Sequence, residues 1–253
     1  MAEKKKTESK ALASVEPSGF AIVDQPQARE TMLAAFDQLG ITESLLQRIK
    51  LPLGGMTAFM VDDLDGQQEH QHIDVILVAI KGRQKAWWSK PLEDAGGGAR
   101  PTCSSTDGIH GYGNNTLTED APEGKHLCAE CPWGKFGSNR GGGNGKDCKD
   151  FSVLFFFREG SRIPAVMQVP ATSLKALQNY VLRLIDNGKR FEGVVTRLSL
   201  KSAQSATGIA YSQLDVSYVK DLEGEQVETM VEIGKSFMAR MQDYNAFGDE
   251  AEA

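Results

Sequence analysis

The sequence lacks long apolar runs. No stretch approaches the roughly 18 consecutive apolar residues that a membrane-spanning helix requires. Its first residues, Met1 to Lys6, lead into further polar residues instead of the apolar segment of a secretory signal. These absences argue against membrane insertion and secretion. We therefore expect a soluble, cytoplasmic protein that makes no membrane contact.

Positive charge is in deficit. The chain has 28 lysine and arginine residues against 34 aspartate and glutamate residues, which gives a formal net charge of -6. This balance argues against a protein that simply coats nucleic acid through excess positive charge. Lysines cluster within the first ten residues, whereas no lysine or arginine follows Arg240. We predict a flexible basic arm over residues 1–27, a folded domain over residues 28–241 and an acidic tail over residues 242–253.

Cysteine is scarce, and all of it lies in one segment. Residues 91–150 are rich in Gly, Asn, Asp and Ser and have few apolar side chains to bury, so ordered structure there needs another source of stability. Cys128 and Cys131 form a C-x-x-C pair, whose spacing lets both sulfur atoms reach one tetrahedral ion. The following Pro-Trp-Gly resembles the turn of a zinc knuckle. We predict an insertion over residues 91–150 stapled by a structural Zn2+ ion, with the ligands Cys103, Cys128, Cys131 and Cys148.

Other interpretations of the cysteines exist. Two disulfides or four unrelated thiols are the alternatives, and a reducing cytosol disfavours disulfides. His110 and His126 lie in the same segment, and either could replace a cysteine as a ligand. A deaminase-type catalytic site needs H-x-E and P-C-x-x-C, but no proline directly precedes Cys128 and His126 begins no H-x-E. Four cysteines would close the coordination shell, so the pattern predicts a structural metal and not an enzyme.

Hydrophobic periodicity predicts the elements around the insertion. Two short helices are expected within residues 28–50, and a strand buried on both faces over 73–80 is followed by a tight turn at 81–84 and a partner strand over 85–88. Then come a hairpin (151–157 and 163–169), a helix (172–185), two strands (191–200 and 209–219) and a helix (225–241). This order predicts an α+β, mainly β fold: an OB-like five-stranded barrel with flanking helices and one helix between its third and fourth strands. An α+β sandwich is the alternative.

Aromatic and basic residues coincide on the first predicted hairpin and just after the C-x-x-C pair. Stacking rings beside phosphate-binding cations are the means by which OB domains hold single strands. Trp87 and Trp88 are adjacent, so on a regular strand they point to opposite faces and at most one faces a ligand. The alternative is that the rings belong to the core and the lysines are solvated. The candidate nucleic-acid contacts are Arg83, Lys85, Trp87, Trp88, Trp133, Lys135, Phe136 and Arg140.

The motifs of the insertion resemble those of known proteins. The runs Cys103–Gly108 (CSSTDG), Cys128–Gly134 (CAECPWG) and Lys146–Lys149 (KDCK) resemble a group of phage and mobile-element proteins. The arrangement is also similar to the zinc-containing, helix-destabilising single-stranded DNA-binding proteins of large tailed phages. In those proteins the zinc ligands include a histidine, whereas four cysteines are available here.

That resemblance implies a fold, a role and partners. It implies an OB barrel with a zinc-stapled insertion, acting in DNA replication or recombination in the host cell cytoplasm. It also implies that the acidic C-terminal tail docks replication or recombination proteins. Phe247, Asp249 and Glu250 would belong to the docking peptide.

Two other functions compete with single-stranded DNA binding. Net negative charge favours a zinc-containing phage regulator that docks on a host protein such as RNA polymerase. The strongest hint of an enzyme is a polar run before the first predicted strand, which could bind a metal but which a polar turn explains equally well. That run contains Asp62, Asp63, Asp65, Gly66, His70 and His72. We therefore expect a non-enzymatic single-stranded DNA-binding protein.

Overall fold

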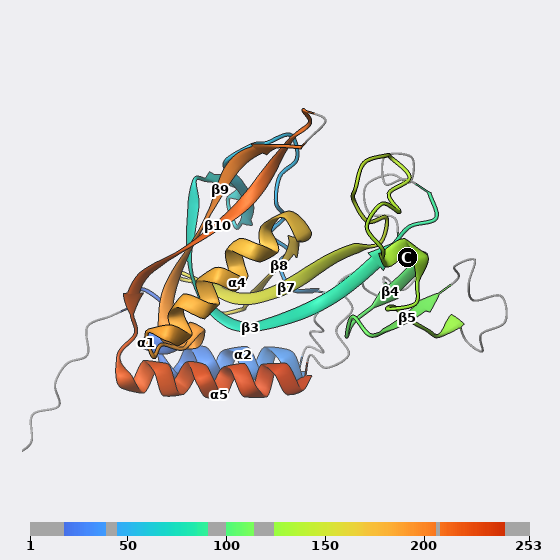
Figure 1. Cartoon of the computed structure of the whole chain (residues 1–253). Helices are drawn as coiled ribbons and strands as arrows, with labels where there is room; N and C mark the ends of the chain where they lie inside the picture. The colour runs from blue at the N-terminus through green and yellow to red at the C-terminus, as the bar shows by residue number, and fades with distance from the viewer. Residues whose placement is uncertain (1–17, 39–44, 91–99, 114–123, 206–207, 241–253) are drawn as a thin grey trace, which may run out of the picture.

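The computed structural model describes residues 18–38, 45–90, 100–113, 124–205 and 208–240 (Figure 1). Its helices are α1 (Ala21–Asp24), α2 (Pro26–Gln38), α4 (Ala171–Asp186) and α5 (Gly224–Arg240), with the short 3-10 helices η3 (Pro132–Gly134) and η4 (Phe191–Gly193). Its strands are β1 (Phe59–Asp63), β2 (Gly66–His70), β3 (His72–Trp87), β4 (Cys103–Ser105), β5 (His110–Gly113), β6 (His126–Leu127), β7 (Lys149–Arg158), β8 (Ala165–Pro170), β9 (Val194–Gln204) and β10 (Ala210–Asp221). These strands pair antiparallel, so the predicted α+β, mainly β class is confirmed.

β3 is the centre of the main sheet. Its first residues pair with β9, its middle pairs with β7, and its last residues pair with β4. β8 extends the sheet beyond β7, and β10 extends it beyond β9. Among the described strands β8 and β10 do not pair with each other, so the hydrogen bonding does not close a barrel. Residues 47–53 contact both strands, because Ile49 N–H donates to the Val166 carbonyl at 2.9 Å and Leu53 forms a bridge with Tyr211.

The unbroken β3 corrects the prediction of a first hairpin. Lys81 to Gln84 form no reversal of the chain; the register with β7 shifts there instead, and Arg83 has a φ of 58°. A tight turn and a β-bulge both favour glycine and positive φ, which explains why the sequence signal suggested a turn. The bulge lies within one long, bent strand that continues toward the insertion (Figure 1).

Two predictions near the N-terminus are also wrong. Residues 18–27 are not a flexible arm, because Phe20 and Ile22 are buried in the core and α1 and α2 begin in this range. The second helix expected within residues 28–50 is not formed over its described part, where Arg48 makes a β-bridge with β8. The apolar spacing there suits a helix face, but pairing with β8 sets the conformation instead.

The other predicted elements are confirmed as α2, β7 and β8, α4, β9 and β10, and α5. Two hydrophobic cores lie on the two faces of the main sheet. On one face α1, α2 and α5 cover β3 and β7, and Phe237 makes edge contacts with Phe36 and Phe155. On the other face α4 packs through Leu177 and Tyr180. Figure 1 shows α2 and α5 side by side along β3, with the insertion at the far end of β3 and β7.

None of the described helices combines the length and the apolar composition that crossing a bilayer would require.

Candidate metal centre and aromatic cluster

The insertion extends from the end of β3. β4 pairs with β3 and places Cys103 opposite Trp87, and β5 and β6 continue the sheet outward. On the other side of β3, Lys149 at the start of β7 lies opposite Ala86, so Cys148 stands beside Trp87 as well. Pairing with β3 therefore brings together two cysteines from opposite arms of the insertion.

Backbone hydrogen bonds bring the C-x-x-C pair to the same place. Cys128 directly follows β6, and its N–H donates to the carbonyl oxygen of Ile109 at 2.8 Å. Cys131 immediately precedes η3. The N–H of Cys148 donates to the carbonyl oxygen of Trp133 at 2.9 Å. This hydrogen bond holds the segment that follows Cys131, residues 132–140 (the knuckle turn), against the end of β3.

All four cysteines line one cavity of about 10 Å³. A cavity of this size holds about one small ion or water molecule. All four side chains are buried, and none of them forms a disulfide, so the disulfide alternative receives no support. The cysteines surround the cavity without forming a ready-made site. Within the part of the chain that the structure describes, no three His, Cys, Asp or Glu side chains are grouped as a metal ion would need them.

The donor chemistry and the electrostatics of the cavity nevertheless fit zinc. Four thiolates are a typical ligand set of structural zinc sites. Burial raises the pKa of the Cys148 thiol to about 12; nearby Lys85 acts against this rise, and Cys131 and Cys103 add to it. Burial likewise raises the pKa of Cys128. A cation in the cavity would supply the charge that stabilises thiolates in such surroundings.

The two histidines of the insertion differ in their position. His126 lines the cavity, with its Nε2 3.7 Å from the Sγ of Cys103 and its Nδ1 3.3 Å from the carbonyl oxygen of Gly124. The Nδ1 of His110 instead lies 3.1 Å from a carboxylate oxygen of Asp107. His126 is therefore the histidine placed to join or replace a cysteine ligand.

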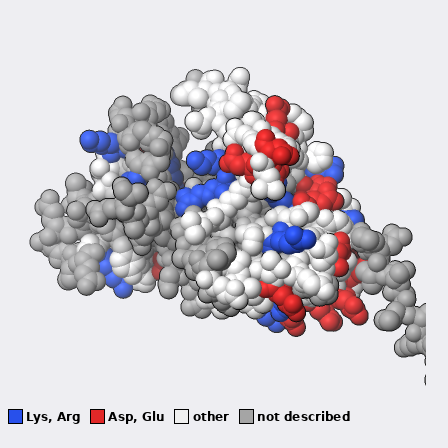
Figure 2. Space-filling view, turned by 180° about the vertical axis from the view of Figure 1, so that it is seen from behind, with Lys and Arg blue, Asp and Glu red and all other residues white. Residues whose placement is uncertain are grey.

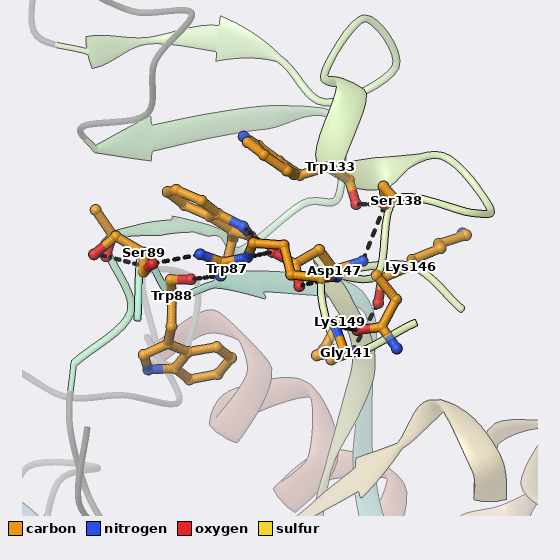
Figure 3. A network of polar contacts seen from close by, with 12 residues as sticks. Trp87, Trp88, Ser89, Trp133, Ser138, Gly141, Lys146, Asp147 and Lys149 are labelled. Carbon is orange, nitrogen blue, oxygen red and sulfur yellow. Dashed lines mark hydrogen bonds and ion pairs between the residues drawn. The ribbon is translucent and has the colours of Figure 1, made fainter. Parts of the chain in front are cut away.

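A stacked pair of tryptophans borders the cavity. The rings of Trp87 and Trp133 have centroids 5.3 Å apart and an interplanar angle of 16°. The guanidinium of Arg140 lies 5.3 Å and 5.7 Å from these two centroids. One oxygen of Asp147 accepts hydrogen bonds from the Trp87 indole N–H at 2.6 Å and from Arg140 Nε at 2.7 Å. The cluster ties the knuckle turn to β3 (Figure 3).

Five of the eight predicted nucleic-acid residues make ring contacts, ion pairs or core contacts within the protein. Trp87, Trp133 and Arg140 form the cluster above, and Lys85 pairs with Asp150 at 3.0 Å. Trp88 points to the opposite side of β3 from Trp87, as predicted, and packs partly against the core (Figure 3). The other three predicted residues are exposed: Arg83, Lys135 and Phe136.

Comparison of this chain with family models, curated proteins and solved structures found no match. The function is therefore inferred from the chemistry of the described residues. That chemistry centres on the cysteine cavity and on the surface around it.

In the described part of the insertion and at the end of β3 basic residues outnumber acidic ones, although over residues 81–150 as a whole the sequence has ten lysine and arginine residues and nine aspartate and glutamate residues. Residues 81–90, 100–113 and 124–150 contain ten lysine and arginine residues against four aspartate and glutamate residues. Asp150 pairs with Lys85 and Lys146. Most acidic side chains on the face shown in Figure 2 lie in the half away from the insertion. Within the part of the chain that the structure describes, this region thus offers a surface for an anionic partner.

Two exposed rings on the insertion lie beside lysines. Phe136 is 79% exposed, and the Nζ of Lys146 lies 4.8 Å from its ring centroid. Tyr112 on β5 is 49% exposed, and the Nζ of Lys125 lies 5.9 Å from its ring centroid. Sequence reasoning found Phe136 but missed the second pair, because Tyr112 and Lys125 become neighbours only when β5 and β6 pair.

Phe247, Asp249 and Glu250 of the acidic tail fall outside the described residues, as does the basic arm before residue 18. The acidic run that suggested an enzyme forms the hairpin of β1 and β2, where Asp63 lies 3.7 Å from Arg158.

Proposed function

We propose that this protein is a non-enzymatic single-stranded DNA-binding protein of phage or mobile-element replication or recombination, and that its insertion holds a structural zinc ion. The observation that carries the proposal is the exposed ring of Phe136 beside Lys146, in the described part of the insertion where basic side chains outnumber acidic ones. Base stacking and phosphate contacts together bind single strands with little sequence preference. Lys135 and Arg83 add exposed charges that make no ion pair with a described residue.

The order of strand pairing supports an OB-like barrel. β3, β7, β8, β9 and β10 would be its five strands, and α4 lies between the third and the fourth, as in that fold. Residues 47–53 contact both β8 and β10 and would occupy the seam that these strands leave open. OB domains contact oligonucleotides partly through the loop between their first and second strands. The insertion occupies that loop.

The insertion is a better candidate than the sheet for the binding surface. In OB domains the face of the second and third strands commonly holds the ligand. Here α2 and α5 cover the corresponding side of β7, where Phe155 packs against Phe237. A single strand of DNA would therefore meet the insertion and the exposed Arg83 of β3.

In this proposal the zinc ligands are Cys103, Cys128, Cys131 and Cys148. The ion would link both arms of the insertion and supply no reaction, because four thiolates leave no position for a substrate. His126 stands beside Cys103 and would donate a hydrogen bond to its thiolate. In this arrangement Trp87 and Trp133 pack beneath the exposed residues of the insertion and do not contact the DNA themselves.

Fluorescence anisotropy of a labelled oligo-dT of about 20 nucleotides, longer than the site of one OB domain, tests the proposal. Zinc-loaded protein is expected to bind it with an affinity that falls steeply as salt rises. Phe136→Ala should weaken binding about tenfold, whereas Phe136→Tyr, which keeps a ring, should bind like the parent. Lys135→Gln should reduce the slope of log affinity against log salt concentration by about the amount that one phosphate contact contributes.

Zinc-loaded protein that binds neither oligo-dT nor duplex would refute single-strand binding and favour the regulator that docks on a host protein. Equal affinity for duplex DNA would also contradict the proposal, because stacking on Phe136 requires an unpaired base.

A further inference from the structure

Tyr112 lies on the face of the insertion sheet opposite the cysteine cavity. The preceding residue, Gly111, faces the cavity, where a Cβ atom would lie 2.6 Å from the Nε2 of His126 and 3.2 Å from the Sγ of Cys103. Glycine is required there by this close approach. Consecutive residues of a strand point to opposite faces, so the side chain of Tyr112 is directed away from the cavity.

Strand pairing places a lysine beside the Tyr112 ring. In the antiparallel pair of β5 and β6, His110 lies opposite Leu127 and Gly111 lies opposite His126. Lys125 directly precedes β6, and extending this register by one residue puts it opposite Tyr112; its Nζ lies 5.9 Å from the ring centroid. The ring is 49% exposed, so it has a free surface for another planar group beside a cation.

A second exposed tyrosine with a lysine beside its ring lies on β10, and its lysine differs from Lys125 in being ion-paired. On β10, Tyr218 is 45% exposed and the Nζ of Lys189 lies 5.3 Å from its ring centroid. Both carboxylate oxygens of Asp221 lie 2.6 Å from that Nζ, so the charge of Lys189 is neutralised. Lys125 makes no ion pair with a described residue. Of these two tyrosine–lysine pairs, Tyr112 and Lys125 therefore combine an exposed ring with a lysine that no described carboxylate neutralises.

We infer that Tyr112 and Lys125 form a second contact for single-stranded nucleic acid. The ring of Tyr112 stacks on a nucleobase, and Lys125 binds a neighbouring phosphate. This inference rests on the proposed function and adds to it. The knuckle turn that carries Phe136 packs on the cavity side through Trp133, whereas Tyr112 faces the other side. One molecule of single-stranded DNA reaches both Phe136 and Tyr112 only by passing around the insertion. The second contact therefore adds affinity only for longer oligonucleotides.

The test compares oligo-dT of about 6 nucleotides, near the lower end of the range of about 4–16 nucleotides for one OB domain, with oligo-dT of about 20 nucleotides, which exceeds that range. Zinc-loaded full-length protein is titrated into each labelled oligonucleotide. Tyr112→Ala should weaken binding of the long strand about tenfold and change binding of the short strand less than twofold. Tyr112→Phe should restore the affinity. Lys125→Gln should reduce the salt dependence for the long strand only.

Tyr218→Ala is the matched control, since it removes a comparably exposed ring beside a lysine and is expected to change neither affinity. Circular dichroism checks the fold of each variant, and Lys125→Gln tests the contact independently should Tyr112→Ala disturb the structure. If Tyr112→Ala and Lys125→Gln bind both lengths like the parent while Phe136→Ala weakens them, the second contact is wrong and the proposed function stands. An equal loss of affinity for both oligonucleotide lengths would overturn the inference that Tyr112 contacts DNA on the opposite face of the insertion from Phe136. Absence of binding by the parent protein would refute the proposed function itself.

Discussion

Arg140 is the residue on which the contacts of the aromatic cluster converge. Its guanidinium lies over the rings of Trp87 and Trp133 and pairs with Asp147. It also donates to the backbone carbonyls of Trp88 and Ser89 (Figure 3). The Asp147 side chain is only 9% exposed, and its carboxylate oxygens accept hydrogen bonds from Arg140 and from the indole of Trp87. Arg140 therefore holds the knuckle turn on β3 through charge, hydrogen bonds and ring contacts together.

We predict that Arg140→Gln lowers the free energy of unfolding by about 1–3 kcal/mol, because hydrogen bonds to a largely buried charge are lost. Urea denaturation followed by tryptophan emission measures this change. The chain's three tryptophans are Trp87, Trp88 and Trp133, all at this junction. Arg29→Gln removes an exposed pair with Glu232 and should cost less than about 0.5 kcal/mol. A similar small loss in both variants would show that Arg140 is only a surface residue.

At the scale of elements, the contact of α5 with β3 depends on a glycine. A Cβ atom at Gly234 would lie 2.8 Å from the carbonyl oxygen of Val78. Alanine favours a helix over glycine by about 1 kcal/mol, but here the helix would have to move off the sheet. We predict that Gly234→Ala destabilises the protein by about 1–3 kcal/mol in thermal or urea denaturation.

Gly224→Ala is the control in the same helix. Nothing lies within 4 Å of the Cβ that it would add, so we expect no loss of stability or a small gain. Equal stability of Gly234→Ala and Gly224→Ala would mean that α5 does not pack on β3 at this distance.

Local signals predicted the elements that have one dominant pattern. The alternation in β9 and β10 and the apolar stripe of α4 were sufficient to place those elements. At Lys81–Gln84 the same residues suit a turn and a bulge, and the partner strand β7 decides between them. Within residues 45–50 the apolar spacing suits a helix, but the contact with β8 sets an extended chain. The conformations of both segments depend on contacts with residues far away in the sequence, and local hydrophobic periodicity carries no information about those contacts.

The candidate site was predicted to a similar extent. The C-x-x-C spacing and the confinement of all cysteines to one segment led us to expect Cys103 and Cys148 near Cys128 and Cys131, and all four line the same small cavity. That they bind zinc remains a prediction. The stacking of Trp87 on Trp133 was not predicted, because it depends on how the knuckle turn folds back over β3. Residues assigned to DNA on composition alone thus include several that hold the insertion together.

At the scale of the whole molecule, two kinds of stabilisation meet at the end of β3. The main sheet has apolar side chains packed on both faces, from α1, α2 and α5 on one side and from α4 on the other. The insertion has only a small buried cluster, formed by Trp87, Cys103 and Cys148 with Trp133 against it. The sheet can therefore be stable on its own core, whereas the insertion depends on the cysteines and on the Arg140 contacts.

Removal of the proposed zinc ion should separate these two parts. We expect a chelator to release about one zinc per chain, change the tryptophan emission and weaken oligo-dT binding, while far-ultraviolet circular dichroism changes little because the main core remains. Cys131→Ser should reproduce the loss of zinc, whereas His110→Ala, which alters a histidine away from the cavity, should retain it. Unfolding of the entire chain on chelation would mean that the sheet needs the insertion. Protein without zinc and with unchanged emission would mean that the four buried cysteines serve only to fill the space beside Trp87.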